Sequence, residues 1–88
     1  MLPGKTDDMS GSSSVQEVCA RVAQILQRER IAQNLSITRL AEGAALSRQG
    51  VSYVERGLRI PSLDTLLRIS RVLGLDLAEV IKEASRQK

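Results

Sequence analysis

Residues 35–57, LSITRLAEGAALSRQGVSYVERG, hold two short stretches in which apolar residues recur at spacings of three and four. That spacing is typical of a helix with one apolar face. Ser36 and Ser47 each precede one stretch, and a serine hydroxyl at this position accepts a hydrogen bond from the free amides of a helix start. The segment therefore predicts two helices of about two turns each, over residues 37–44 and 48–56.

Two short helices joined by a turn of about three residues form a helix-turn-helix, in which the helices cross steeply around small apolar contacts. Ala41 is the small residue expected where the two backbones approach. The buried face is expected to consist of Leu40, Ala44, Leu46, Val51 and Val54. The opposite side of the second helix carries Arg48, Gln49 and Tyr53, so it offers little to a core.

The segment before this pair has the same helical spacing. A helix over residues 15–33 is predicted from the apolar face of Val15, Val18, Val22, Ile25 and Leu26. Asn34 follows and is suited to the left-handed conformation that ends many helices. The lone Cys19 lies within this stretch, which favours a buried small side chain over a reactive thiol.

Ser62 and Asp76 are the N-caps of two further predicted helices, over residues 63–73 and 77–86. Pro61 cannot continue a helix, so an extended turn is expected to separate the third helix from the fourth.

The helix ends carry further local signals. Gly57 and Gly74 are suited to stop the third and fourth helices. Asp76 and Glu79 have the spacing of a capping box. Apolar pairs that fix the entry of a chain into a helix are expected between Leu35 and Leu40, Leu46 and Val51, and Leu75 and Val80.

The chain has 88 residues, which suits one compact domain and leaves no room for two cores. Hydrophobic residues make up 42% of it and aromatic residues 1%, so a core of Leu, Ile, Val and Ala in packed helices is expected. We predict an all-α, five-helix domain over residues 15–88. Residues 1–14 are rich in Ser, Gly and Asp without periodicity and predict a disordered tail, part of which could be a vector remnant.

The 13 Lys and Arg exceed the 10 Asp and Glu, for a net charge of +3, and ten of the basic residues are Arg. Arginine pairs in a fork with phosphate and with guanine, so the balance suits a polyanionic partner. No apolar run is long enough to span a membrane, and the N-terminus lacks the basic start and apolar stretch of a signal peptide. We expect a soluble, cytoplasmic protein without a membrane partner.

The residue inventory argues against an enzyme. The chain has no His, a single Cys and no clustered carboxylates, so neither a metal site nor a nucleophile with its base is predicted. We therefore expect no catalytic residue, no metal and no cofactor.

Together with LRIPSLDTLLRISRVLGLDLAEV at residues 58–80, the opening segment resembles the helix-turn-helix of the phage-repressor and Cro family, also called the xenobiotic-response-element (XRE) family, of bacterial regulators. The resemblance covers about residues 22–81. It rests on correctly spaced residues at Ser36, Leu40, Ala41, Ser47, Val51, Val54, Glu55, Gly57, Pro61, Ser62, Leu66, Leu73 and Gly74. It implies a lambda-repressor-like fold and a sequence-specific DNA-binding transcriptional regulator, most simply a repressor, associated with the nucleoid.

By this resemblance, the helix over residues 48–56 is the recognition helix that enters the major groove. Arg48, Gln49 and Tyr53 match positions that reach base edges, where Arg pairs with guanine and Gln with adenine. Tyr53 would touch a thymine methyl or donate to a phosphate. Without the motif, Arg48 and Gln49 would be interpreted as solvated side chains, and a lone aromatic on a helix of a small domain is more often partly packed than a reader of bases.

Contacts to the DNA backbone are expected from Ser47, Ser52, Arg56, Arg59 and the backbone amides of Ile37 and Thr38. Ile37 departs from the family, in which a Gln often touches phosphate here, so that side-chain contact is not carried over. Arg39 is available nearby, but it also has the spacing of a helical pair with Glu42. Leu58 and Ile60 stand where basic residues are common, which indicates a weaker phosphate grip or a protein contact.

The resemblance assigns Arg30 and Glu55 to a structural ion pair between the first and third helices. It also favours a homodimer, whose recognition helices would lie about 34–36 Å apart on an inverted-repeat operator in double-stranded DNA. The apolar face of the last helix, formed by Leu77, Val80, Ile81 and Ala84, is expected to close the core and leave a surplus for that dimer. The alternative function is a protein-interaction module such as an antitoxin-like subunit or a coactivator, because the same fold serves both.

Overall fold

The structure, a computed structural model, describes residues 14–86. Within that range the chain forms helices and no strand: α1 (Val15–Ala32), α2 (Ile37–Ala44), α3 (Arg48–Glu55), α4 (Leu63–Leu73) and α5 (Leu77–Ser85). The predicted all-α, five-helix fold is confirmed, and each predicted helix boundary lies within one residue of the observed one. The predicted tail lies outside the described residues except for Ser14, which is the N-cap of α1.

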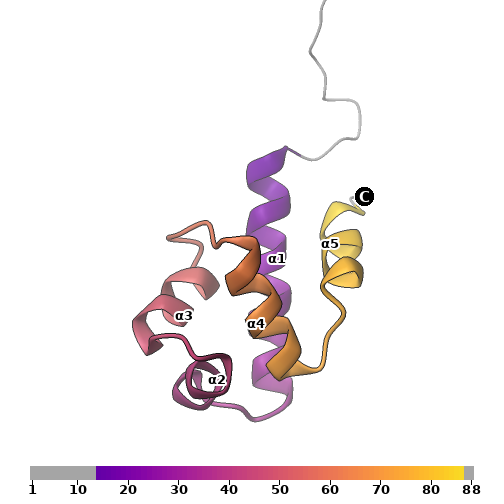
Figure 1. Ribbon diagram of the computed structural model, residues 1–88. Coiled ribbons are helices and arrows are strands. Elements are labelled where there is room, and N and C mark those ends of the chain that lie inside the picture. Colours follow the sequence, from indigo (N-terminus) through magenta and orange to yellow (C-terminus); the bar gives the residue numbers. More distant parts are fainter. Residues whose placement is uncertain (1–13, 87–88) are drawn as a thin grey trace, which may run out of the picture.

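α1 is the longest helix, and α3, α4 and α5 pack against it (Figure 1). α5 lies along one side of α1, while α3 and α4 contact it from the other side. α2 packs against both α3 and α4, and α4 also touches α5. This arrangement leaves the α2–α3 pair at one edge of the molecule, with α5 at the opposite edge (Figure 1).

Short polar side chains begin the helices as predicted. The Ser36, Ser47 and Ser62 hydroxyls accept from the backbone amide three residues later, at 2.9–3.1 Å. The capping box predicted at Asp76 is not formed, because the Asp76 carboxylate accepts from the Ala78 amide one residue earlier than the box requires. A capping box is found instead at Ser14, which accepts from the Glu17 amide and donates its own amide to the Glu17 carboxylate.

The first four helices end in the same way. After each of them one residue takes a positive φ: Asn34, Ala45, Gly57 and Gly74. The amide of the next residue then bonds back to a carbonyl in the last turn, as Leu46 does to Ala41 at 2.9 Å. The surprising member is Ala45 with φ 58°, because a left-handed residue with a Cβ costs about 1–2 kcal/mol.

The core is aliphatic, as the composition predicted. It consists of Val22, Ile25, Leu26, Leu40, Ala41, Val51, Val54, Ile69, Leu73, Leu77, Val80 and Ala84. Two residues predicted on inward faces are exposed instead, since Val15 is 76% exposed and Ile81 is 39% exposed. Leu46 is half-buried, and so is Cys19, which had been expected in the interior.

Ser70 is the polar exception in this core. Its side chain is 1% exposed, and the hydroxyl finds no hydrogen-bond partner among the described residues.

None of the five helices combines the length and the apolar character needed to cross a bilayer.

Candidate nucleic-acid interface

α3 is held by its inner side and both of its ends. Val51 and Val54 point into the core and are 0% and 3% exposed. The Ser47 hydroxyl caps the first turn through the Gly50 amide at 2.9 Å. This anchoring leaves the first turn and the outer side of α3 in solvent at the edge of the molecule (Figure 1).

The last turn of α3 is clamped to α1 by an ion pair. Arg30 Nε and Nη2 donate to the two carboxylate oxygens of Glu55 at 2.7 and 3.0 Å, and Arg30 Nη1 donates to the Leu35 carbonyl at 2.8 Å. The Arg30 and Glu55 side chains are 12% and 2% exposed. The structure thus places the predicted pair inside the protein, with both Glu55 oxygens bound to Arg30.

Arg48 lies at the first position of α3, and its side chain is exposed. Its Nε donates to the Thr38 hydroxyl of α2 at 3.1 Å. The guanidinium has five N–H groups, so four of them, on Nη1 and Nη2, remain for another partner. The contact joins the N-terminal turns of α2 and α3.

Gln49, Tyr53 and Arg59 form a second connected group. The Gln49 amide nitrogen donates to the Tyr53 hydroxyl at 2.7 Å, across one helical turn. The Arg59 guanidinium lies over the Tyr53 ring, 5.2 Å from its centroid. Gln49 and Arg59 are exposed and Tyr53 is half-buried, so the group lies on the surface rather than in the core.

The residues expected at the DNA backbone surround these two groups. Arg56 follows α3 as its C-cap and is exposed, while Ser52 is half-buried. The Ser36 cap uses the Arg39 amide, which leaves the Ile37 and Thr38 amides at the open N-terminus of α2.

Gly50 lies in the same turn, where glycine costs about 0.5–1 kcal/mol relative to alanine. A Cβ built at Gly50 would come within 2.9 Å of the Ser47 hydroxyl and would meet no atom of another helix within 4 Å. Close approach of a neighbouring helix therefore does not explain this glycine. Gly43 of α2 does lie close to another helix, since a Cβ there would be 3.2 Å from a methyl group of Val72 on α4.

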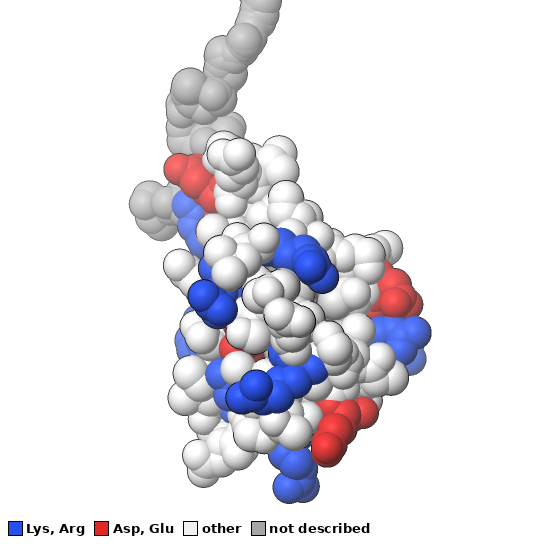
Figure 2. All heavy atoms as spheres, turned by 90° about the vertical axis from the view of Figure 1, so that its left-hand side faces the viewer, with Lys and Arg blue, Asp and Glu red and all other residues white. Residues whose placement is uncertain are grey.

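Positive charge gathers on this side of the molecule. Four exposed arginines, which we call the basic face, lie on α2, on α3 and in the linker after α3: Arg39, Arg48, Arg56 and Arg59. Glu42 is the one exposed acidic residue of α2 and α3. Figure 2 looks onto this side and shows basic side chains across it, with the larger acidic groups at its margins.

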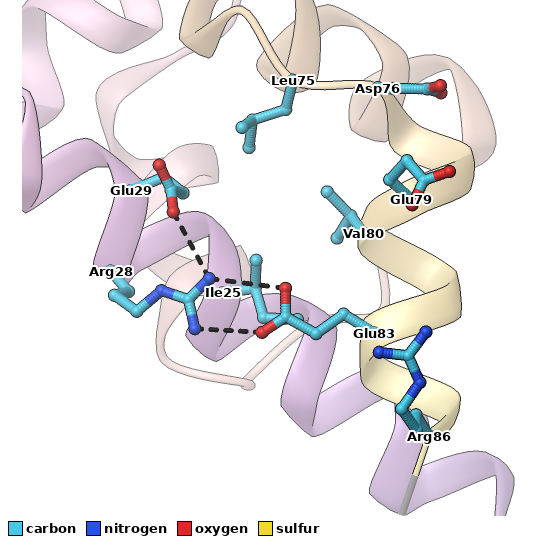
Figure 3. A pocket seen from close by; sticks show the side chains of 9 residues that line it. All are labelled: Ile25, Arg28, Glu29, Leu75, Asp76, Glu79, Val80, Glu83 and Arg86. Carbon is cyan, nitrogen blue, oxygen red and sulfur yellow. Dashed lines mark hydrogen bonds and ion pairs between the residues drawn. The ribbon is translucent and has the colours of Figure 1, made fainter.

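The opposite side, between α1 and α5, is rich in acidic groups. A hollow of about 380 Å³ is lined there by the side chains shown in Figure 3, among them Glu29, Glu79 and Glu83. Arg28 bridges Glu29 and Glu83 at 3.3 and 3.1 Å, and its hydrogen bond with Glu83 raises the pKa of the Arg28 guanidinium. Within residues 14–86, no three His, Cys, Asp or Glu side chains gather closely enough to hold a metal ion. The exposed arginines of the basic face therefore make the α2–α3 side the more favourable of the two for a polyanion.

Two side-chain hydrogen bonds at the start of α3 were not predicted from the sequence. The Thr38 side chain was not assigned a role, and its contact with Arg48 depends on how α2 crosses α3. The contact between Gln49 and Tyr53 has the four-residue spacing of helical neighbours, so the sequence did contain a signal for it.

Comparison with protein families matches residues 26–80 to the helix-turn-helix family model, and the chain belongs to this XRE-type helix-turn-helix family. A search of curated proteins finds no match.

Three solved structures illustrate the likeness. The restriction-modification controller protein C.AhdI from Aeromonas hydrophila is 33% identical, with a TM-score of 0.66 over 72% of this chain and 94% of that one. The clp gene regulator ClgR from Corynebacterium glutamicum is 26% identical, with a TM-score of 0.70 over 82% and 73%. SinR, a master regulator for biofilm formation solved in complex with DNA, is 28% identical, with a TM-score of 0.64 over 68% and 97%.

Proposed function

We propose that the protein is a sequence-specific DNA-binding transcriptional regulator that reads the major groove with α3, and that it acts most simply as a repressor by occluding a promoter. In this proposal the protein catalyses no reaction, and it is a cytoplasmic protein that associates with the nucleoid. The neighbours named above are regulators, and one of them was solved on DNA. Their roles support the class of function, and the residues of this chain define its details.

The observation that carries the proposal is the exposed outer side of α3 beside the basic face. Arg48 and Gln49 lie in the first turn of α3, where a recognition helix meets base edges. Arg48 is suited to guanine O6 and N7, and Gln49 to adenine N6 and N7. Tyr53 lies beside them and completes the predicted set of base-contacting residues.

Phosphates would be held at the margins of this surface. Arg56 and Arg59 supply charge on one side, with the Ser47 and Ser52 hydroxyls nearby. On the other side, the Ile37 and Thr38 amides offer the positive end of the α2 dipole.

A homodimer would bring two such surfaces to an inverted-repeat operator. Exposed aliphatic residues that follow α3 in the chain support this arrangement, and we propose that they form the dimer patch: Leu58, Ile60, Leu63 and Leu67 are 61%, 73%, 63% and 41% exposed. Leu63 and Leu67 are four residues apart on one face of α4, and Leu58 and Ile60 lie in the linker before it.

Sedimentation tests the dimer. Leu63→Glu should convert a dimer into monomers, because it would bury a carboxylate without a partner in the contact. Ile31→Glu is the matched control, since Ile31 is 58% exposed at the far end of α1. A wild-type monomer, or equal effects of both changes, would contradict the proposed patch.

The salt dependence of binding to duplex DNA tests the function itself. With Arg56 and Arg59 on phosphates in both protomers, the logarithm of the binding constant should fall with a slope of about −4 against the logarithm of salt concentration. Selection from random duplexes should then enrich an inverted repeat. Binding that depends on neither salt nor sequence would favour the protein-interaction module instead.

A further inference from the structure

The exposed side chains of Arg48 and Gln49 at the start of α3 are each held by a hydrogen bond to another side chain. Arg48 is tied to Thr38 on α2 at 3.1 Å, and Gln49 is tied to Tyr53 one turn later at 2.7 Å. Each tie uses one hydrogen-bonding group of a side chain that has several. The groups left over therefore decide what each side chain can still recognise.

Arg48 contributes its Nε–H to the Thr38 hydroxyl. The N–H groups of Nη1 and Nη2 stay available, and these two nitrogens form the end of the guanidinium fork. Two parallel donors at the end of an arginine are what guanine requires, because its O6 and N7 are adjacent acceptors in the major groove. The Thr38 hydroxyl therefore binds the Nε–H of Arg48, which a guanine contact through Nη1 and Nη2 does not need.

Gln49 contributes one N–H of its amide to the Tyr53 hydroxyl. One N–H and the carbonyl oxygen remain, which makes one donor beside one acceptor. Adenine presents the complement, an N7 acceptor beside an N6 donor. The Arg59 guanidinium lies over the Tyr53 ring and restrains it, so the contact between Arg59 and Tyr53 also supports the orientation of Gln49.

Building on the proposed function, we propose that the hydroxyl groups of Thr38 and Tyr53 position Arg48 and Gln49 and so set base specificity, while the ring of Tyr53 remains the part predicted to touch a base. Holding a flexible side chain in its binding conformation lowers the entropy lost on binding, and it does so for the matching base. A wrong base would have to break the internal hydrogen bond or leave a donor unpaired.

Thr38 has a second role within this arrangement. Its backbone amide lies in the first turn of α2, where a phosphate is expected, while its side chain holds Arg48 of α3. Phosphate contacts fix the register of a protein on DNA, and base contacts read the sequence. One residue thus couples the register of the protein to the position of its guanine-reading side chain.

Two isosteric variants separate these roles from a structural one. Thr38→Val removes the acceptor for Arg48 but keeps the shape and the backbone amide, and Tyr53→Phe removes the acceptor for Gln49 but keeps the ring beneath Arg59. Thr38→Ser is the conservative control, because it restores the hydroxyl. Each protein is used for selection from random duplex DNA, and its affinity is then measured for the wild-type operator and for operators changed at single bases.

We expect Thr38→Val to lose about threefold to tenfold in discrimination at the base read by Arg48, with the base read by Gln49 unaffected. Tyr53→Phe should show the reverse pattern, and Thr38→Ser should behave as wild type. Melting temperatures should stay close to wild type for all three, since both contacts are on the surface.

Uniform weakening across all operators, with the salt slope unchanged, would make the Thr38 or Tyr53 hydroxyl a phosphate contact and overturn the proposal for that residue. Unchanged discrimination in both variants would overturn it entirely. A wild-type protein that enriches no sequence would overturn the proposed function as well, which is a different result from enrichment that the variants leave intact.

Discussion

Replacing Glu55 by Gln tests how the recognition helix is held. The change keeps the size of the side chain but removes the charge that faces Arg30. It also replaces one carboxylate oxygen, which accepts from Arg30 at 2.7 or 3.0 Å, by an amide NH₂ group that cannot accept a hydrogen bond. Because the Glu55 side chain is 2% exposed and that of Arg30 is 12% exposed, water cannot replace the lost partner.

The magnitude follows from this burial. Breaking a buried pair by removing one partner costs about 3–5 kcal/mol, and the Arg30 bond to the Leu35 carbonyl, which the substitution keeps, places the estimate at about 3 kcal/mol. A domain of this size loses about 4–8 °C in melting temperature per kcal/mol, so Glu55→Gln should melt about 12–24 °C below wild type.

Thermal unfolding followed by circular dichroism measures this shift, and operator selection below the melting temperature measures base preference. Glu42→Gln is the matched control, since Glu42 is exposed on α2 and the same chemical change there should alter stability by less than about 0.5 kcal/mol. A melting curve like that of wild type, combined with an altered base preference, would show that Glu55 belongs to the DNA contact and not to the scaffold.

Three further substitutions probe the fold by denaturant unfolding. Ala45→Gly should raise the free energy of unfolding by about 1 kcal/mol, because it relieves a left-handed alanine in the turn between α2 and α3; a decrease would contradict that strain. Gly74→Ala should lower the free energy of unfolding by about 1–2 kcal/mol, because φ is +73° at this position. No atom lies within 4 Å of the new methyl group, so the loss would be conformational and an unchanged free energy would contradict it. Ser70→Ala should stabilise the protein by about 1 kcal/mol by removing a buried hydroxyl without a partner among the described residues, and destabilisation would reveal a hydrogen bond at that site.

The helix boundaries could be predicted because their signals are local. Ser36, Ser47 and Ser62 cap the helices that their positions indicated, since a cap needs only a hydroxyl and the next three residues. The turn at Ala45 could not be predicted, because conformational preference argues against alanine with a positive φ. The turn forms despite that preference, and the Leu46 amide closes it by donating to the Ala41 carbonyl at 2.9 Å.

The site divides in the same way. Arg30 and Glu55 are 25 residues apart, and no spacing rule joins them, so their pairing was expected from the family resemblance alone. The contact of Thr38 with Arg48 depends on the crossing of two helices, which periodicity does not fix. The roles of Arg48, Gln49 and Tyr53 on DNA stay predictions, supported by their exposure and their neighbours.

Selection of bound sequences from random duplex DNA, carried out in parallel with wild type, Arg48→Ala and Gln49→Ala, examines whether the outer side of α3 reads bases. We predict that wild type enriches an inverted repeat and that each variant loses preference at its own single base pair in every half-site. If both variants bind all sequences more weakly but keep the wild-type preference, these side chains do not read the bases.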